Sequence, residues 1–224
     1  MVNISHIVEK IVSEKPFLQE ALARGIVNNS ALAEELIPEI ERELKKKVKF
    51  SAVNMAIRRL SEKLDKSFIV NVRFDQDTDI STRSDLVEIP VFKTEDVQEH
   101  VKKLYDIVNF KKGDFLTVTQ GLHEVMIITN KRYERRVLEI FPKKSIKQVI
   151  SDVSSITINI PDESLETVGL FYLVTRALTW ENINIIDIVS TLNEMTFIIR
   201  EEDTAKAYDC LKGLIADNKH KKRK

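Results

Sequence analysis

The 224-residue chain has little cysteine, glycine or tryptophan, and these shortages narrow the classes of protein that it can be. The single cysteine, Cys210, excludes an internal disulfide and a zinc site built from several cysteines. The five glycines are scattered, so no glycine-rich loop is available to cradle a phosphate group. The four histidines share no metal-ligand spacing, and no nucleophile-elbow motif is present. We therefore expect no metal, no cofactor and no catalytic residue.

A charge excess of one sign and long apolar runs are also missing. The 35 basic residues balance the 35 acidic ones, so any binding to nucleic acid has to come from a local excess of charge. No apolar run approaches the roughly 20 residues needed to span a bilayer, and residues 1–16 lack the apolar core of a signal peptide. We expect a cytoplasmic protein without membrane contact. The frequent Lys, Glu and Ile residues lean toward a thermophilic source.

Apolar residues recur at helical spacing through residues 1–66, which predicts an all-helical domain. Gly25 is a candidate C-cap, and Asn28 with its polar neighbours is a candidate cap of the helix that follows. Pro38 should kink or split that helix because proline cannot donate the backbone hydrogen bond. Ser51 is the expected cap of the third long helix.

Positive charge gathers between residues 42 and 66, where nine basic residues outnumber three acidic ones. The surrounding helices resemble a helix-turn-helix variant, which implies DNA binding, because arginine suits guanine edges, asparagine suits adenine edges and lysine suits phosphates. The candidate DNA-binding residues are Lys45, Lys46, Lys47, Lys49, Ser51, Asn54, Arg58, Arg59 and Lys63. The third helix is also expected to expose Ser61 and Glu62. The alternative is a solvated basic helix that packs against protein.

Strand and helix patterns alternate beyond residue 67. Strands are expected at residues 68–74, 85–92, 114–120, 123–129 and 146–150, with helices at 94–109 and 133–141 and a polar loop at 75–84. A similar order repeats about 70 residues later, with strands at 155–160, 183–192 and 195–200 and helices at 165–180 and 204–216. The order predicts an α+β fold with two ferredoxin-like βαββαβ units, each with a four-stranded antiparallel sheet.

The second of these units lacks a fourth strand of its own. Residues 68–74 either complete its sheet or form one arm of a wing hairpin beside the helical domain. The expected organisation is a helical domain at 1–66, a strand and connector at 67–84, a first unit at 85–150, a second unit at 151–218 and a basic tail at 219–224.

Three short segments of the second unit carry a family resemblance. They are Thr167-Val168-Gly169-Leu170-Phe171 at the expected start of a helix, Asn182-Ile183-Asn184-Ile185, and Ile188-Val189-Ser190-Thr191. Together they resemble ACT domains, the amino-acid-sensing modules found beside many biosynthetic enzymes, and the third segment resembles especially the regulatory domains of aspartate kinases. Val168 departs from the family, which often has proline there. The whole layout is similar to uncharacterised archaeal proteins with an N-terminal helical domain and paired ACT domains.

The resemblance implies an amino acid effector bound between ACT units. A carboxylate would accept from amide groups at the start of the helix that Gly169 opens, and asparagine oxygens would hold the amino group. The candidate ligand-binding residues are Asp162, Glu163, Glu166, Val168, Gly169, Leu170, Asn182 and Asn184. The alternative is an acidic, solvated loop with ordinary helix capping. The corresponding loop of the first unit, residues 92–96, has no glycine, and we expect that unit to be mainly structural.

The leading hypothesis is an amino-acid-sensing regulator of transcription that binds double-stranded DNA. It would work as a homodimer or a higher oligomer, joined through its ACT sheets or its helices. One alternative is a non-catalytic regulatory subunit that binds a small effector and docks on an amino-acid biosynthetic enzyme. Another is a free-standing amino acid binder without further output.

Overall fold

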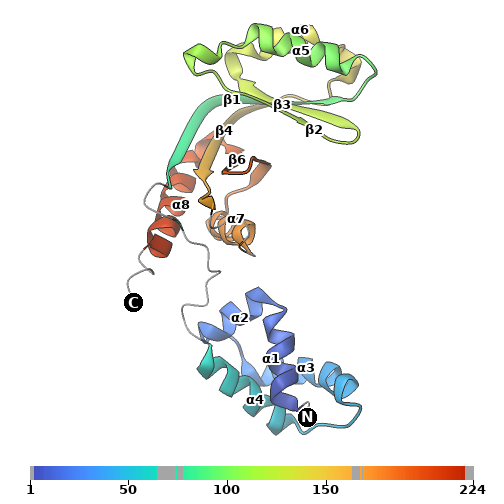
Figure 1. Cartoon of the computed structure of the whole chain (residues 1–224), viewed down its shortest axis with the longest axis vertical. Helices are drawn as coiled ribbons and strands as arrows, with labels where there is room; N and C mark the ends of the chain where they lie inside the picture. Colours follow the sequence, from blue (N-terminus) through green and yellow to red (C-terminus); the bar gives the residue numbers. More distant parts are fainter. Residues whose placement is uncertain (1–2, 65–73, 75–77, 163–166, 168, 220–224) are drawn as a thin grey trace. The chain divides into compact units, whose positions relative to one another are not determined.

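The computed structural model describes residues 3–64, 74, 78–162, 167 and 169–219, and the chain divides into two compact units, residues 1–71 and 72–224. Each unit has a core of its own and is described by itself. Figure 1 shows the helices of the first unit in blue to teal, and the sheet and helices of the second in green to red. Among the described residues, no helix combines the length and the apolar character that a membrane span requires.

The described part of the first unit consists of α1 (Ile4–Ser13), α2 (Pro16–Ala23), α3 (Asn29–Leu44) and α4 (Phe50–Lys63). The apolar stripes of the helices meet in one buried cluster that includes Ile7, Leu36 and Ile57. The helical character predicted for this part of the chain is therefore confirmed for the described residues. Burial of these stripes, more than helix propensity alone, stabilises helices of this length.

Two of the predicted helix ends are confirmed, and the cap expected at Ser51 is wrong. The Asn28 side chain accepts from the amides of Ser30 and Ala31 and caps α3, and Gly25 ends α2 in the left-handed conformation with φ +69°. Pro38 does not split α3, because it lies on the exposed side of the helix, where water can bond the carbonyl that it leaves free. Ser51 is not a cap: α4 begins one residue earlier, with Lys49 at the N-cap and no side-chain cap.

The described part of the second unit contains one antiparallel sheet of six strands in the order β2-β3-β1-β4-β6-β5. The strands are β1 (Ile80–Phe92), β2 (Leu116–Gln120), β3 (Glu124–Asn130), β4 (Ile150–Asn159), β5 (Ile185–Ser190) and β6 (Glu194–Arg200). The helices are α5 (Val97–Ile107), α6 (Glu134–Ile140), α7 (Leu170–Trp180) and α8 (Thr204–Lys219). The mixed α/β character and the repeated order of elements are as predicted.

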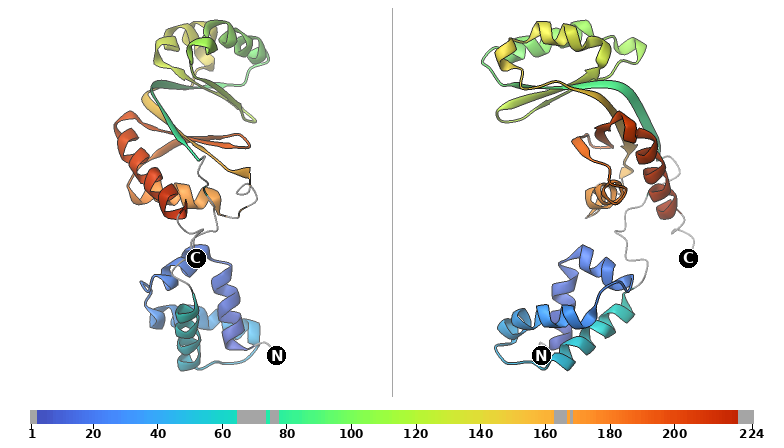
Figure 2. Two further views of the ribbon diagram at one scale, coloured as in Figure 1. Left: turned by 60° about the vertical axis from the view of Figure 1, so that its left-hand side comes forward. Right: turned by 180° about the vertical axis from the view of Figure 1, so that it is seen from behind.

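The two long central strands, β1 and β4, join two similar halves of the sheet. The end of β1 pairs with β3 in the first half, while its beginning, from Ile80 to Arg83, pairs with β4 beside β6 in the second half. Figure 2 shows β1 bending as it passes from one half to the other. Asp85 and Asp152 have φ values of +57° and +58°, next to the register shifts between β1 and β4. The bend therefore coincides with bulges, which let a sheet change direction.

Equivalent hydrogen bonds show the similarity of the halves at atomic detail. The hairpin between β2 and β3 is closed by Gly121 N–H donating to the Glu124 carbonyl at 2.8 Å, and the one between β5 and β6 by Thr191 N–H donating to the Glu194 carbonyl at 2.9 Å. Each tip also accepts a bond from the strand leading into the half, at 2.9 Å from Lys93 and 2.7 Å from Ile160. Both halves thus repeat one local design, with different residues.

Three strand predictions need correction. Residues 80–84, expected as part of a polar loop, belong to β1, because they pair with β4 on one side only and keep their polar side chains in solvent. The two strands expected at 146–150 and 155–160 are largely one strand, β4, preceded by a single bridge between Ile146 and Val91. The six strands form one curled sheet instead of two separate ones. Of the predicted strand at 68–74, only Phe74 is among the described residues; it is buried and not in a strand.

Helices cover one face of each half, as Figure 1 shows for α5 and α6 above the first half. Under them lies a cluster that includes Val87, Ile127 and Leu104. The opposite face carries a smaller apolar cluster of Leu86, Ile128, Val153 and Ile198, which belong to the four strands nearest the centre of the sheet. The face without helices is therefore apolar at its centre and more polar toward its ends.

Candidate functional site

The first part of the predicted effector site lies at the start of α7. Gly169 is its N-cap with φ +91°, and the first amide groups of the helix have no side-chain acceptor among the described residues. Leu170 is buried. Asp162 accepts a hydrogen bond from the Asn193 side chain, which ties it to the tip of the hairpin between β5 and β6. The remaining predicted residues of this loop, Glu163, Glu166 and Val168, are outside the described residues.

The second part of the predicted site lies at the other end of the same helix. Asn182 has φ +56° and directly follows the C-cap of α7. Its N–H donates to the Thr179 carbonyl at 2.9 Å and the N–H of Ile183 donates to the Leu178 carbonyl at 3.1 Å, the bonding pattern of a Schellman motif. Asn182 therefore has a structural task in ending the helix. Asn184 is exposed just before β5.

The structure does not bring these two parts together within one chain. Gly169 and Asn182 flank the 11 residues of α7, and at 1.5 Å per residue a helix of this length separates them by roughly 16 Å. An α-amino acid cannot span that distance between its carboxylate and its amino group. Within one copy of the chain, the predicted ligand-binding residues therefore lie at two separate places.

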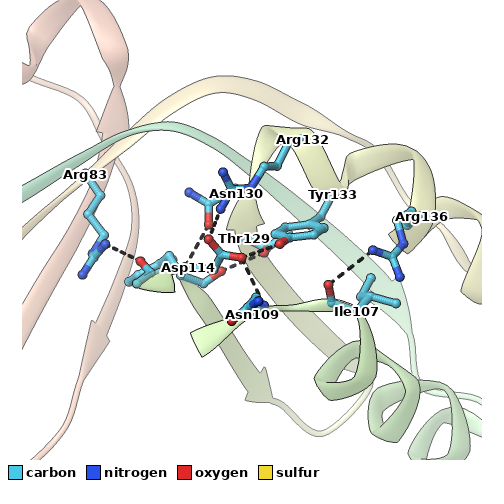
Figure 3. Close-up of polar contacts among 11 residues, drawn as sticks. Arg83, Ile107, Asn109, Asp114, Thr129, Asn130, Arg132, Tyr133 and Arg136 are labelled. Atoms are coloured by element: carbon cyan, nitrogen blue, oxygen red, sulfur yellow. Dashed lines mark hydrogen bonds and ion pairs between the residues drawn. The ribbon is translucent and has the colours of Figure 1, made fainter. Parts of the chain in front are cut away.

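The corner that precedes β2 holds a polar cluster that sequence reasoning missed (Figure 3). Asp114 lies at its centre, with a side chain only 1% exposed. Its carboxylate accepts hydrogen bonds from the Asn109 amide at 3.1 Å, from the Arg132 guanidinium and from the Tyr133 hydroxyl. The Arg132 side chain stays 57% exposed and lies over the Tyr133 ring, 5.2 Å from its centroid. These three donors hold the loop, the corner and the end of β3 together.

Further bonds extend the cluster into the sheet. The Asn130 side chain accepts from the Phe115 amide at 2.8 Å, and the Thr129 hydroxyl donates to the Phe115 carbonyl at 2.7 Å. Arg83, at the beginning of β1, donates to the Gly113 carbonyl at 2.7 Å. The sequence does not predict this cluster, because an aspartate before a strand is common and its partners here come from other elements. The arrangement is suited to fixing the backbone, since the described donors already occupy the carboxylate.

Glu88 in β1 is a second unusual acidic group. Its residue is only 2% exposed, and its Oε2 atom has no hydrogen-bond partner. Burial, with a smaller contribution from the charge of Asp187 on β5, raises the pKa of its carboxyl to about 7. Glu88 can therefore gain or lose a proton near neutral pH. Among the described residues, no group of three or more His, Cys, Asp or Glu side chains is placed to hold a metal ion.

The predicted DNA-binding residues all lie in the first unit, in α4 or in the turn before it. Lys45, Lys46, Lys49, Arg59 and Lys63 are exposed and form no ion pair among the described residues. Lys47 is paired with Glu41 at 2.8 Å and Arg58 with Glu62 at 3.1 Å. Ser51 is exposed, and Asn54 is half-buried.

One expectation for the exposed side of α4 is wrong. Ser61 is half-buried, and its hydroxyl donates to the Leu22 carbonyl of α2 at 2.9 Å. Its small side chain fits the seam between the two helices. Lys45, Lys46, Lys49, Arg59 and Lys63 are thus the predicted cations that have no ion pair within the described part of the chain.

Comparison with solved structures first gives the class of fold. The part of the chain that the comparisons cover has an ACT-like fold, shared with the regulatory domains of aspartate kinases. Comparison with known protein families and with curated protein sequences finds no match.

Particular solved structures then show how far the similarity reaches. An aspartate kinase from Clostridium acetobutylicum, described as an allosteric enzyme, is 16% identical with a TM-score of 0.50, over 61% of this chain and 34% of that one. An aspartate kinase from Synechocystis is 13% identical with a TM-score of 0.50, over 75% of this chain and 32% of that one. The ligand-free regulatory subunit of aspartate kinase from Thermus thermophilus is 15% identical with a TM-score of 0.48, over 60% and 95% of the two chains. The chain thus spans about a third of the length of the two kinases.

Proposed function

We propose that the second unit is a non-catalytic regulatory module that binds a small amino acid effector, and that the first unit carries the response. The observation that supports this most directly is the ACT-like sheet, whose two similar halves share β1 and β4. A ligand that fits one arrangement of such halves better than another shifts the equilibrium between them. Coupling of this kind is typically worth about 1–3 kcal/mol.

The effector site that we propose combines two half-sites. The amides at the start of α7 have no side-chain cap from the residues that the structure describes and lie at the positive end of the helix dipole, which suits a carboxylate. Asn184 is exposed and suits an amino group. Because α7 separates the two, the start of α7 in one copy would meet the start of β5 in another. The proposal therefore includes a homodimer that forms through the sheets or helices of this unit.

A thermal-shift screen of the full chain against the twenty amino acids tests this proposal. A ligand that binds only the folded state stabilises it by mass action and so raises the apparent melting temperature. At a ligand concentration of 100 times the Kd, the gain in unfolding free energy is about 2.7 kcal/mol. We expect one amino acid or a few related ones to raise it, and Asn184→Ala to weaken the response. Asn54→Ala, in the other unit, is the matched control and should respond like the parent chain. A flat screen would contradict the proposal.

For the response of the first unit, we propose binding to double-stranded DNA. Support comes from the five exposed cations around α4 that have no ion pair among the described residues. Phosphate contacts make the affinity fall steeply with salt. Each contact adds about one unit to the slope of the logarithm of the binding constant against the logarithm of the salt concentration. Lys49→Ala and Arg59→Ala should each flatten the salt dependence, whereas Asn184→Ala should leave it unchanged.

A second candidate for the response is docking on an amino-acid biosynthetic enzyme. It is favoured by Phe50 and Met55 of α4, which are 40% and 48% exposed on the same helix as the cations. Apolar and basic side chains together are typical of protein contacts as well as of nucleic-acid contacts. If no salt-sensitive DNA binding is measured with or without the effector, this second candidate replaces the first.

A further inference from the structure

A hollow of about 430 Å³ opens on the face of the second unit that has no helices. Its walls come from β2, with Phe115 to Val118, and from the hairpin of β5 and β6; its floor includes Thr157 of β4 and Thr196 of β6. Ser154 of β4 bonds Thr204 of α8, and side chains alternate along a strand, so Thr157 faces away from that helix. The volume lies within the range of pockets that hold small molecules.

The charged groups of the hollow lie at its two ends. In the sheet register Ser81, Thr157 and Thr196 form one row, with their side chains on the same face. Arg83 belongs to the next row on one side, paired with Ser155, and Glu194 to the next row on the other side, paired with Asn159. Four residues along a strand cover roughly 13 Å. Because β4 lies between β1 and β6, the Cα atoms of Arg83 and Glu194 are roughly 16 Å apart, and hydroxyl groups lie between them.

Both charges are left without an ionic partner among the described residues. Arg83 bonds only the Gly113 carbonyl, which occupies one of its several N–H groups. Glu194 forms no ion pair, although the equivalent glutamate of the other half, Glu124, is bound by Lys147 at 2.6 Å. The position equivalent to Lys147 is Ser81 of β1, because Lys147 lies opposite Pro90 and Ser81 lies opposite the corresponding Thr157. The same hairpin corner is therefore neutralised in one half and negatively charged in the other.

We infer that this hollow binds a small molecule with a carboxylate at one end and an ammonium group at the other. Arg83 receives the carboxylate, Glu194 receives the ammonium group, and the hydroxyls of Thr157 and Thr196, themselves 2.8 Å apart, bond polar atoms between the two. Phe115 and Val189, which pack against the apolar cluster of this face, contact the carbon chain of the ligand. The site is separate from the half-sites at the two ends of α7, so it adds to the proposed function.

The ligand would also connect the two halves. Arg83 lies on the β1–β4 side of the second half, while its partner Gly113 immediately precedes Asp114 in the corner of the first half. A carboxylate on the guanidinium would hold Arg83 in its bonded position and thus steady that corner. The site therefore has a physical route to the position of β2.

Titration of the full chain with 6-aminohexanoate, hexanoate and hexylamine tests the inference, because these molecules share one chain length and differ only in their end groups. Saturable binding of 6-aminohexanoate is expected, with weaker binding of the other two. Arg83→Gln should raise the Kd about tenfold and abolish the preference over hexylamine, since each charged hydrogen bond contributes about that factor. Glu194→Gln should abolish the preference over hexanoate. Arg135→Gln, at an exposed arginine outside the hollow, is the control.

Several results would overturn the inference. Absence of saturable binding of 6-aminohexanoate would do so, as would binding that is unchanged in both Arg83→Gln and Glu194→Gln. The variants lie at exposed positions, and an unchanged melting temperature without ligand verifies their folding. An amino acid response that Asn184→Ala weakens and Arg83→Gln leaves intact would support the proposed effector site and argue against the hollow. If no amino acid shifts the melting temperature but 6-aminohexanoate still binds, the hollow is supported and the proposed effector site is contradicted.

Discussion

The two halves of the sheet have the same order of elements but differ at the corner before their second strand. In the first half this corner is closed around Asp114, which receives hydrogen bonds from Asn109, Arg132 and Tyr133. In the second half the residue two positions before β5 is the buried, apolar Ile183, and Asn184 beside it is exposed. The residues that correspond to Arg132 and Tyr133 belong to the acidic turn Glu201–Asp203.

This difference distinguishes polar side chains that the fold needs from polar side chains that can bind a ligand. Both corners are compatible with the same hairpin bonds and the same pairing of long strands. The first half uses its polar groups to bond itself, whereas the second leaves Asn184 and Glu194 without such partners. Polar groups that the fold does not consume are the ones available to a ligand. We therefore expect substitutions in the second half to affect ligand binding more, and substitutions in the first half to affect stability more.

The largest expected effect is loss of the closed corner in Asp114→Asn. Removing the negative charge leaves Arg132 without its partner and should cost about 3 kcal/mol, the lower end for a broken buried pair, because Arg132 is half-exposed. Denaturant unfolding followed by the fluorescence of Trp180, the single tryptophan of the chain, reports on this unit. Asn184→Ala is the matched control and should change stability by less than about 0.5 kcal/mol. Equal losses would contradict the distinction between the corners.

The next effect concerns Glu88, whose equivalent in the second half is the uncharged Ser155. Burial, with a contribution from Asp187, raises the pKa of Glu88 to about 7 from its ordinary value of 4.5. The folded state thus binds this proton more tightly than the unfolded state, so its stabilising contribution is full below pH 4.5 and is lost as the pH rises through about 7. Glu88→Gln should match the parent chain at pH 5 and exceed it by on the order of 2 kcal/mol at pH 8.

Unfolding measured at both pH values checks this expectation. Asp187→Asn is an informative second variant, because it removes only the neighbouring charge; it should lower the folded-state pKa of Glu88, so the fall in stability should end at a lower pH and be smaller in total. Glu62→Gln, at an exposed glutamate of the first unit, is the control. A parent chain whose stability is constant between pH 5 and pH 8 would show that Glu88 remains ionised or finds a partner in solution.

The local elements were predictable from sequence where a single periodicity decides them. The apolar stripe of α1 and the turn signal at Gly121 identified a helix and a hairpin correctly. The beginning of β1 was missed because Ser81, Thr82 and Arg83 are polar; they pair on one side only, so the usual apolar alternation is not needed. Likewise β4 was divided in the prediction, since the left-handed Asp152 interrupts its pattern without ending the strand.

The site was less predictable than the fold, for a physical reason. Gly169 and Asn184 were predicted as site residues by resemblance, but their separation by the length of α7 depends on the three-dimensional structure. The partners of Asp114 come from an earlier loop and from the turn after β3, so no short motif contains them. Arg83 and Glu194 belong to strands of different repeats and reach one hollow only because β1 passes between the halves.

A smaller effect is expected at the two bulges. Asp85 and Asp152 adopt the left-handed conformation, which costs an ordinary side chain about 1–2 kcal/mol and glycine almost nothing. Asp85→Val should therefore lose about 1–2 kcal/mol, while Asp85→Gly should keep or slightly gain stability. Asp152→Gly should gain less, because Asp152 also bonds Lys131 at 2.7 Å. Unfolding of Asp85→Val, Asp85→Gly, Asp152→Val and Asp152→Gly tests whether the two bulges are equivalent. If valine leaves stability unchanged at one of the two positions, they are not.

The smallest effect on stability, and the sharpest one for function, is expected for Asn182→Gly. Glycine is the preferred residue at the left-handed position of a Schellman motif, so the end of α7 should persist and stability should change by less than about 0.5 kcal/mol. In the first half Asn109 lies just after α5, but its φ is negative. That position does not need a residue that tolerates the left-handed conformation, so the test applies to the second half only. If the thermal shift produced by an amino acid disappears in Asn182→Gly while the melting temperature without ligand is unchanged, the asparagine side chain binds the effector. If the shift persists, Asn182 serves only to end the helix, and Asn184 alone represents this end of α7 in the effector site.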